Sequence, residues 1–258
     1  MTFATTREAY DAYMGRYANR LAPLLIAFAE VQPAESVLDV GCGPGSLSEA
    51  LGAHVGAEQV SAIDPSEQFA AATAERVPGA DVQVGVAELL PWPAEMFDAA
   101  LAQLVVNFMS DADAGVGEMR RVVRPGGTVA ACTWDYSGGM TMLRTFWDAA
   151  LALDPAAPDE ALTMRLHDPN ELRELWLRAG LEAVDADELV VEVSYRDFDD
   201  YWEPFTGGVG PGGAYTSSLD SSRREALREE CRRRLGDPDA AFTLAATAWA
   251  VKGRAPEL

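Results

Sequence analysis

The chain has 258 residues, of which 48% are hydrophobic, and a formal net charge of −21 at pH 7. This length and apolar content suit one domain with a sizeable core. Because nucleic-acid binding depends on Lys and Arg that displace counterions from phosphate, so acidic a chain disfavours nucleic acids and anionic lipids as partners. We therefore expect a small-molecule substrate, and neither a nucleic-acid nor a membrane partner; no pattern in the sequence indicates the oligomeric state.

Cysteine usage and the N-terminal sequence indicate the compartment. Cys42, Cys132 and Cys231 are odd in number and form no C-x-x-C pair, which favours a reducing environment over a disulfide framework. The N-terminus carries acids and tyrosines without the apolar core of a signal peptide, and the apolar run 24–29 is too short to span a bilayer. These features predict a cytoplasmic protein.

The first half of the chain alternates short β-branched runs with helical patterns, which is typical of a parallel, doubly wound sheet. Strands are expected at residues 36–40, 59–63, 81–84, 97–102 and 128–133. Helices are expected between them at residues 47–52, 66–77 and 112–123. The RPGG turn at 124–127 ends the last of these helices and leads into the fifth strand.

The second half of the chain is less regular. Residues 169–179 are predicted to be helical, because Asp168 is a suitable N-cap, Pro169 follows it and Gly180 ends the pattern. The remaining expected elements are two strands and a helix, at residues 188–195, 242–251 and 223–235. Glycine and proline residues around 205–214 predict a mobile loop that could lie over an active site.

The most informative segment is VLDVGCGPGSL at residues 37–47, which joins the first expected strand to the first helix. It carries glycines at alternate positions, namely Gly41, Gly43 and Gly45. Glycine permits positive φ and lets a ligand lie directly on the backbone. The loop follows the carboxyl end of a strand, which is where open α/β sheets bind ligands.

The spacing of the loop narrows the class of ligand. A dinucleotide fingerprint would require glycine at Ser46, and a P-loop would require a lysine. Without either, an uncharged or cationic nucleoside is favoured over a diphosphate. Asp39, two residues before the loop, can brace it and attract a ligand ammonium group.

Several segments of the chain resemble the motifs of one enzyme family. DVGCGPG, residues 39–45, resembles the first motif of class I S-adenosylmethionine-dependent methyltransferases. Asp64, in VSAIDPS, falls where that family places an acid that bridges the ribose hydroxyls, and one carboxylate can accept both hydrogen bonds. In the family, residues matching Ala87 and Glu88 flank the adenine ring. The segment 118–135, EMRRVVRPGGTVAACTWD, is similar to the small-molecule branch that includes quinone-biosynthesis C-methyltransferases.

The resemblance implies S-adenosyl-L-methionine as cofactor, with S-adenosyl-L-homocysteine as product, and a set of binding residues. These are Asp39, Gly41, Cys42, Gly43, Gly45, Asp64, Pro65, Ala87, Glu88, Gln103 and Tyr17. One position departs from the family pattern, because Val86 stands where an acid often accepts from the adenine amino group. We therefore expect backbone groups near Ala87 and apolar packing to hold the adenine.

The whole chain, residues 1–258, is expected to form one methyltransferase domain of α/β class. Its Rossmann-like, doubly wound and mostly parallel sheet would have seven strands, with helices on both faces and a helical lid insertion. Residues 1–34 would be an N-terminal helical cap and 35–135 the cofactor-binding core. Residues 136–258 would supply the lid segments and the last strands.

Aromatic residues are candidates for enclosing the cofactor. In the family, the N-terminal segment that here carries Tyr10, Tyr13 and Tyr17 folds over the cofactor. Further aromatic residues would approach from the lid side, namely Trp134, Trp202, Phe205 and Tyr215. An aromatic enclosure favours a sulfonium through cation–π attraction, while filling of the core is an equally good interpretation of any single ring.

Catalytic groups are harder to assign. Transfer of a methyl group from a sulfonium is an in-line displacement with an activated leaving group, so the protein must chiefly align the reactants. Gln103 and Asn107 could orient the acceptor or the cofactor, and Asn107 stands where relatives often have a histidine. His167 could act as a base or be a solvated loop residue. No catalytic base is predicted, and no metal site, because neither histidine lies at a ligand spacing from Cys, Asp or Glu.

Three functions remain open from the sequence. The first is methyl transfer to a small molecule, at oxygen, nitrogen or carbon. The second is a nicotinamide-dependent oxidoreductase, although Ser46 replaces the third glycine and the single lysine, Lys252, excludes a Tyr-x-x-x-Lys pair. The third is a regulatory protein that binds S-adenosylmethionine without turnover.

Overall fold

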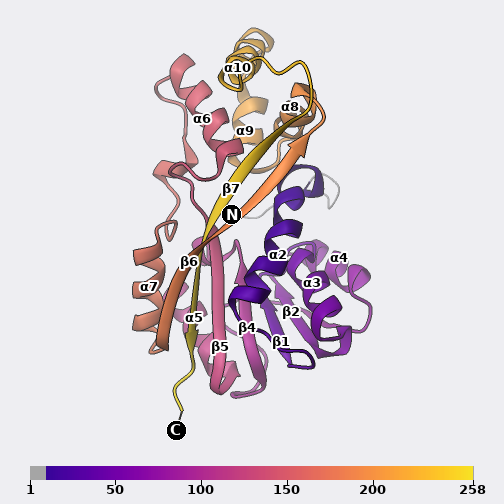
Figure 1. Cartoon of the computed structure of the whole chain (residues 1–258), viewed down its shortest axis with the longest axis vertical. Coiled ribbons are helices and arrows are strands. Elements are labelled where there is room, and N and C mark those ends of the chain that lie inside the picture. The colour runs from indigo at the N-terminus through magenta and orange to yellow at the C-terminus, as the bar shows by residue number, and fades with distance from the viewer. Residues whose placement is uncertain (1–9, 258) are drawn as a thin grey trace.

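A seven-stranded sheet between two layers of helices forms the body of the molecule (Figure 1). The computed structural model describes residues 10–257. Its strands are β1 (Val37–Val40), β2 (Val60–Asp64), β3 (Asp81–Val84), β4 (Phe97–Gln103), β5 (Val123–Trp134), β6 (Glu182–Tyr195) and β7 (Phe242–Arg254). Their order across the sheet is β3-β2-β1-β4-β5-β7-β6. Strands β1 to β5 pair in parallel and β7 is antiparallel to both neighbours, which confirms the mostly parallel, doubly wound sheet.

Helices cover both faces of the sheet because successive strand residues point to opposite sides. One layer consists of α2 (Arg16–Phe28), which continues a π-helical turn η1 (Asp11–Gly15), together with α3 (Ser46–Val55) and α4 (Glu67–Arg76). The other layer consists of α5 (Ala112–Val122) and α7 (Pro169–Arg178). On β1, Val37 packs in the same core as α2 and α3, while Leu38 packs with α5 and α7.

The ends of several helices lie where capping residues place them. The Ser66 hydroxyl accepts from Phe69 N at the start of α4, and Asp111 caps α5 through Ala114 N at 3.0 Å. Asp168 accepts from Asn170 N at 2.8 Å. Pro169 then opens α7 and Gly180 follows it with φ of +76°. The helix predicted from residue 169 is therefore confirmed, together with its N-cap, its first-turn proline and the glycine that follows it.

Four helices gather around the outer ends of β6 and β7 and form the lid (Figure 1). They are α6 (Thr141–Leu153), α8 (Phe198–Thr206), α9 (Gly210–Ser218) and α10 (Ser221–Arg234), with a short 3-10 turn η4 (Glu160–Leu162). Strands β6 and β7, the two longest in the sheet, pair from Glu182↔Arg254 to Tyr195↔Phe242. The lid helices pack around the ends of these two strands. Inside it, the Phe146 and Phe205 rings stack with centroids 4.3 Å apart.

The prediction of a mobile loop around 205–214 was wrong, because helix α8 extends to Thr206 and helix α9 begins at Gly210. A Cβ on Gly212 would lie 3.1 Å from the Phe205 ring, and one on Gly213 would lie 2.7 Å from the Gly208 backbone. These glycines therefore allow α9 to pack closely on α8. Composition cannot separate this use of glycine from its use in a loop.

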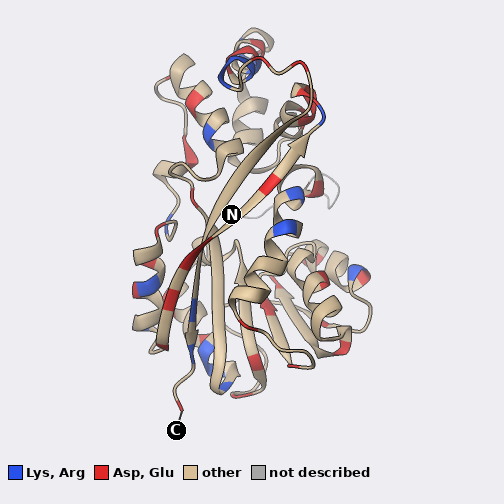
Figure 2. Ribbon diagram, viewed as in Figure 1, with Lys and Arg blue, Asp and Glu red and all other residues tan. Residues whose placement is uncertain are grey.

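Charged residues of both signs lie side by side on the outer lid helix α10 (Figure 2). Glu230 accepts from Arg233 at 2.6 Å and from Arg234 at 2.9 Å, so these two consecutive arginines are partnered at the surface. Among residues 10–257, no helix is long and apolar enough to cross a membrane.

Candidate active site

A cavity of about 380 Å³ lies at the carboxyl ends of the parallel strands, below the lid. We divide its lining into two sets. The cofactor half is lined by residues that follow strand ends, among them Asp39, Gly41, Cys42, Gly43, Asp64, Pro65, Ala87, Glu88 and Gln103. The lid half is lined by Tyr13, Trp134, Tyr136, Leu143, Glu160 and Val209. This size and this mixture of apolar walls with few polar groups are typical of small-molecule sites.

The three loop glycines have positive φ but different reasons for being glycine. A Cβ on Gly41 would collide with Val105. A Cβ on Gly45 would press on Thr73 of α4 at 3.0 Å, and Gly45 does not line the cavity. Gly43 lines the cavity, and a Cβ there would meet no atom within 4 Å. The space a ligand could use is therefore the space beside Gly43.

Asp39 is a buried carboxylate with one oxygen held and one free. Its side chain is on β1, and the residue is only 1% exposed. The Ser48 hydroxyl of α3 donates to Oδ2 at 2.6 Å, while Oδ1 has no partner among residues 10–257. Burial raises the Asp39 pKa to about 7. A cationic donor in the cavity would satisfy the free oxygen and favour the charged form.

Asp64 joins the end of β2 to the glycine loop. Its Oδ2 accepts from Gly43 N at 2.9 Å and its Oδ1 accepts from Ser66 N at 2.8 Å. Burial is the largest influence and raises the pKa of this carboxyl, against the two amides, which lower it. Each oxygen keeps further acceptor capacity, so two hydroxyl donors could still bind.

Residues 85–88, which follow β3, form the cavity wall between the carboxylates of Asp39 and Asp64 and helix α5. Val86 and Ala87 both line the cavity there. Glu88 also lines it, but its Oε1 accepts from the backbone amides of Ser110 and Asp111 at 2.8 and 3.1 Å. Glu88 therefore ties this wall to the start of α5, whatever else it contacts.

Gln103 and Cys42 complete the predicted residues that border the cavity. Gln103 Nε2 donates to Ala18 O at 3.1 Å, which joins β4 to α2, and its buried Oε1 has no partner among the described residues. Burial raises the pKa of the Cys42 thiol, which keeps the sulfur protonated. No group of three or more His, Cys, Asp or Glu side chains between residues 10 and 257 is arranged to hold a metal ion.

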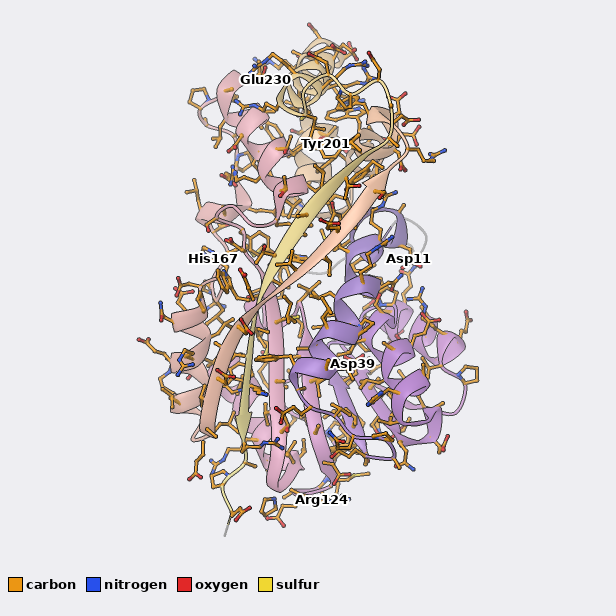
Figure 3. All side chains as sticks on the ribbon, in the orientation of Figure 1. Asp11, Asp39, Arg124, His167, Tyr201 and Glu230 are labelled. Atoms are coloured by element: carbon orange, nitrogen blue, oxygen red, sulfur yellow. The ribbon has the colours of Figure 1, made fainter. Side chains whose placement is uncertain are left out.

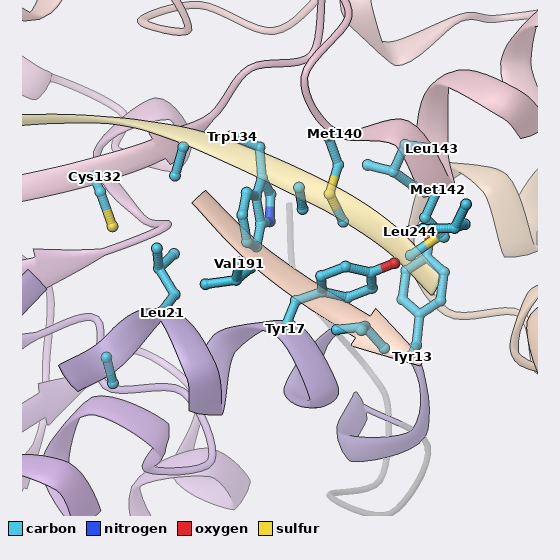
Figure 4. Close-up of a cluster of buried hydrophobic side chains, with 14 of the residues drawn as sticks. Tyr13, Tyr17, Leu21, Cys132, Trp134, Met140, Met142, Leu143, Val191 and Leu244 are labelled. Carbon is cyan, nitrogen blue, oxygen red and sulfur yellow. The ribbon is translucent and has the colours of Figure 1, made fainter. Parts of the chain in front are cut away.

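The structure does not place Tyr17 at the cavity, contrary to expectation. The residue is fully buried, its hydroxyl lies 2.7 Å from that of Tyr195 on β6, and its ring packs edge-on to Trp134. Figure 4 shows it among the buried side chains between α2 and the two long strands. Helix α2 turns Tyr17 toward the core and its neighbour Ala18 toward the cavity.

The other aromatic candidates fall into two groups, those that line the cavity and those that do not. Tyr10 and Tyr13 from the N-terminal segment and Trp134 from the end of β5 line the cavity. Trp134 Nε1 is buried there without a partner in the described part of the chain. The remaining three lie within the lid away from the cavity wall, namely Trp202, Phe205 and Tyr215.

Neither candidate catalytic group borders the cavity. Asn107 is 6% exposed, and its Nδ2 lies 3.5 Å from Met164 Sδ. His167 packs edge-on to Tyr136 with centroids 6.3 Å apart, and Figure 3 shows it on the opposite side of the molecule from Asp11. Asn107 Oδ1 and His167 Nδ1 are both buried without a partner among the described residues, and the catalytic role of either residue stays a prediction.

One carboxyl group that faces the cavity was not predicted from the sequence. Glu160, in the turn η4, is 5% exposed and lines the lid half. Trp147 Nε1 donates to its Oε1 at 2.9 Å. Burial raises the Glu160 pKa to about 7. No motif could have identified it, because it is a single acid in an irregular segment, PAAPDEAL.

Comparison with known proteins assigns the family. Residues 38–131 match the model of a methyltransferase domain. The chain is 34% identical over 150 residues to malonyl-[acyl-carrier protein] O-methyltransferase of Pseudescherichia vulneris, a match that spans only 57% of either protein. It is 32% identical over 196 residues to the protein of that name from Salmonella typhimurium, covering 69% of this chain and 77% of the relative.

A solved structure confirms the fold over nearly the whole chain. The YcgJ protein of Bacillus subtilis superposes with a TM-score of 0.60, covering 93% of this chain and 99% of that one at 18% identity. The family match excludes the nicotinamide-dependent oxidoreductase. The chain belongs to the class I S-adenosylmethionine-dependent methyltransferases and is an enzyme that uses S-adenosyl-L-methionine.

Proposed function

We propose that this methyltransferase acts on a small molecule held in the lid half of the cavity, with the cofactor in the other half. The observation that carries the proposal is a single cavity whose two halves differ in kind. One half offers buried carboxylate and amide oxygens at strand ends, and the other offers aromatic and apolar walls with a single acid, Glu160.

The residues of the cofactor half fit S-adenosyl-L-methionine. Asp39 Oδ1 and Gln103 Oε1 are buried acceptors without partners in the described chain, which suits the ammonium of the methionine end. Asp64 can accept both ribose hydroxyls, as its remaining lone pairs allow. The open space at Gly43 leaves room for a ligand on the loop backbone, and Val86 with Ala87 offers an apolar wall to the adenine.

The chain's own contribution to the reaction would be enclosure and alignment. When bound, the cofactor supplies a methyl group already activated by its sulfonium. Tyr13 and Trp134 border the cavity with aromatic rings, which favour a positive charge. The lid excludes water and holds the acceptor in line for displacement, and proximity of this kind supplies several kcal/mol.

A labelling experiment tests the small-molecule acceptor. The enzyme is incubated with S-adenosyl-L-methionine carrying a trideuteromethyl group, together with a panel of apolar amines, phenols and carboxylic acids and, separately, with an acyl carrier protein. Mass spectrometry then locates the label. We expect label on a small molecule and none on the carrier protein. Label on the carrier protein alone would contradict the proposal.

A further inference from the structure

The charges of the cavity wall point to one class of acceptor. The ionisable carboxyl groups that line it are Asp39, Asp64, Glu88 and Glu160. No Lys, Arg or His belongs to the lining among residues 10–257. A wall with acids and no basic group attracts cations and repels carboxylates and phosphates.

Glu160 is the only one of these acids in the lid half, and it is held firmly. Asp159 caps the turn η4 by accepting from Ala161 N at 3.0 Å, and Arg144 of α6 donates to Asp159 Oδ2 at 2.7 Å. Trp147 Nε1 fixes Glu160 Oε1 at 2.9 Å. Glu160 lines the cavity, and only Oε1 of its two carboxylate oxygens has a hydrogen bond within the described chain, so Oε2 is the oxygen left for a ligand.

The surroundings of Glu160 leave its charge without a partner. Arg144, whose charge acts on Glu160 and lowers its pKa, is itself bound to Asp159 and to Asp148, each at 2.7 Å. Tyr13 from η1 and Tyr136 from the segment after β5 face Glu160 closely enough for mutual electrostatic effects, and neither carries a positive charge. The raised Glu160 pKa, about 7, has this burial as its main cause. An ammonium group in the lid half would complete the site.

We propose, on the basis of the function proposed above, that the acceptor is an amine on an apolar body and that Glu160 Oε2 binds its nitrogen and removes its proton. The ammonium gives one proton to the Glu160 carboxylate, and the freed lone pair forms the N–CH3 bond as the S–CH3 bond breaks. The methylated amine leaves as a cation, and the proton on Glu160 passes to water. Charge therefore balances without any other reactant.

Binding in the presence of saturating S-adenosyl-L-homocysteine tests the class of acceptor. Calorimetry compares phenethylamine and tryptamine with 3-phenylpropionate and 2-phenylethanol. We expect the amines to bind at least tenfold more tightly than the carboxylate and the alcohol. Equal binding of all classes, preference for the carboxylate or alcohol, or no binding of amines to the homocysteine-loaded enzyme would overturn the proposal.

Substitution of Glu160 tests the residue itself. Glu160→Gln keeps the acceptor for Trp147, and we expect it to weaken amine binding at least tenfold while the affinity for S-adenosyl-L-homocysteine stays unchanged. With S-adenosyl-L-methionine saturating, so that Asp39 is already paired, the rise of kcat/KM for the amine with pH through about 7 should disappear in this variant. Glu192→Gln, at an exposed acid of β6, is the matched control and should change neither quantity. Glu160→Asp keeps the charge and should retain the amine preference in part.

The outcomes separate this proposal from the proposed function. An enzyme that binds S-adenosyl-L-homocysteine but shows the same amine affinity and the same pH profile with Glu160→Gln refutes the role of Glu160 and leaves methyl transfer standing. Failure of the unaltered enzyme to bind S-adenosyl-L-homocysteine contradicts the proposed function first.

Discussion

The two halves of the cavity are built in different ways. The residues of the cofactor half lie within a few positions of the ends of β1 to β4, and parallel register brings those ends together, as in Asp39↔Ala62 and Asp39↔Leu101. The lid half collects Tyr13, Glu160 and Val209 from segments that are far apart in the chain. A sheet therefore places a cofactor site by local sequence, whereas the acceptor site depends on how separate helices pack.

The largest expected effect comes from filling the space at Gly43. Gly43→Leu would place a side chain where a Cβ now meets nothing within 4 Å, inside the cavity. We expect calorimetry to show a loss of S-adenosyl-L-homocysteine affinity of about 100-fold, which is about 2.7 kcal/mol. Gly236→Leu is the matched control, because Gly236 is also at positive φ beside open space, but on the exposed surface after α10. Equal losses in both variants would mean that backbone strain, and not the cavity, is responsible.

Asp39 should show a conflict between binding and stability. Its pKa is about 7 when folded and near 3.8 when unfolded, so the unliganded fold loses stability as pH rises between these values. Asp39→Asn removes that cost, and thermal unfolding of the unliganded protein at pH 8 should therefore occur at a higher temperature. The gain should shrink as pH falls toward 4. Binding of S-adenosyl-L-homocysteine should weaken about tenfold, since a carboxylate no longer faces its ammonium.

Tyr17 separates core packing from cofactor contact. Tyr17→Phe removes a buried hydroxyl that is 2.7 Å from the Tyr195 hydroxyl. We expect a loss of about 1 kcal/mol in the free energy of unfolding by urea denaturation. Affinity for S-adenosyl-L-homocysteine should stay the same. A tenfold weaker affinity would contradict this account and indicate that Tyr17 contributes to cofactor binding.

Glu88 should give the smallest effect. Glu88→Gln keeps an oxygen that can accept from the Ser110 and Asp111 amides, so the wall after β3 should hold its place. Calorimetry should show a change of less than about threefold in S-adenosyl-L-homocysteine affinity, or under 0.7 kcal/mol. A larger loss with an unchanged melting temperature would make Glu88 a direct ligand.

The same contrast explains what could be predicted from the sequence. Asp39, Gly43 and Asp64 could be predicted to lie together because a strand, a turn and a spacing are local patterns, and the sheet brings them to one cavity. The ends of α7 were predicted for a similar reason, since caps act within one turn.

Features set by distant packing were missed. The direction in which α2 turns Tyr17 depends on β6, and the place of Glu160 depends on α6 and η4. Strand β6 starts at Glu182, six residues before the predicted start. The earlier start was missed because the acidic stretch EAVDAD lacks a run of β-branched residues, and this stretch becomes extended by pairing with β7.

Calorimetric titration with S-adenosyl-L-homocysteine, beside NADH, on the enzyme and on Asp64→Ala tests the central claim most directly. The account predicts micromolar binding of S-adenosyl-L-homocysteine alone, weakened at least tenfold by the substitution, because Asp64 both holds the loop at Gly43 and faces the ribose site. Binding of NADH in preference, or S-adenosyl-L-homocysteine affinity that is indifferent to Asp64, would contradict it.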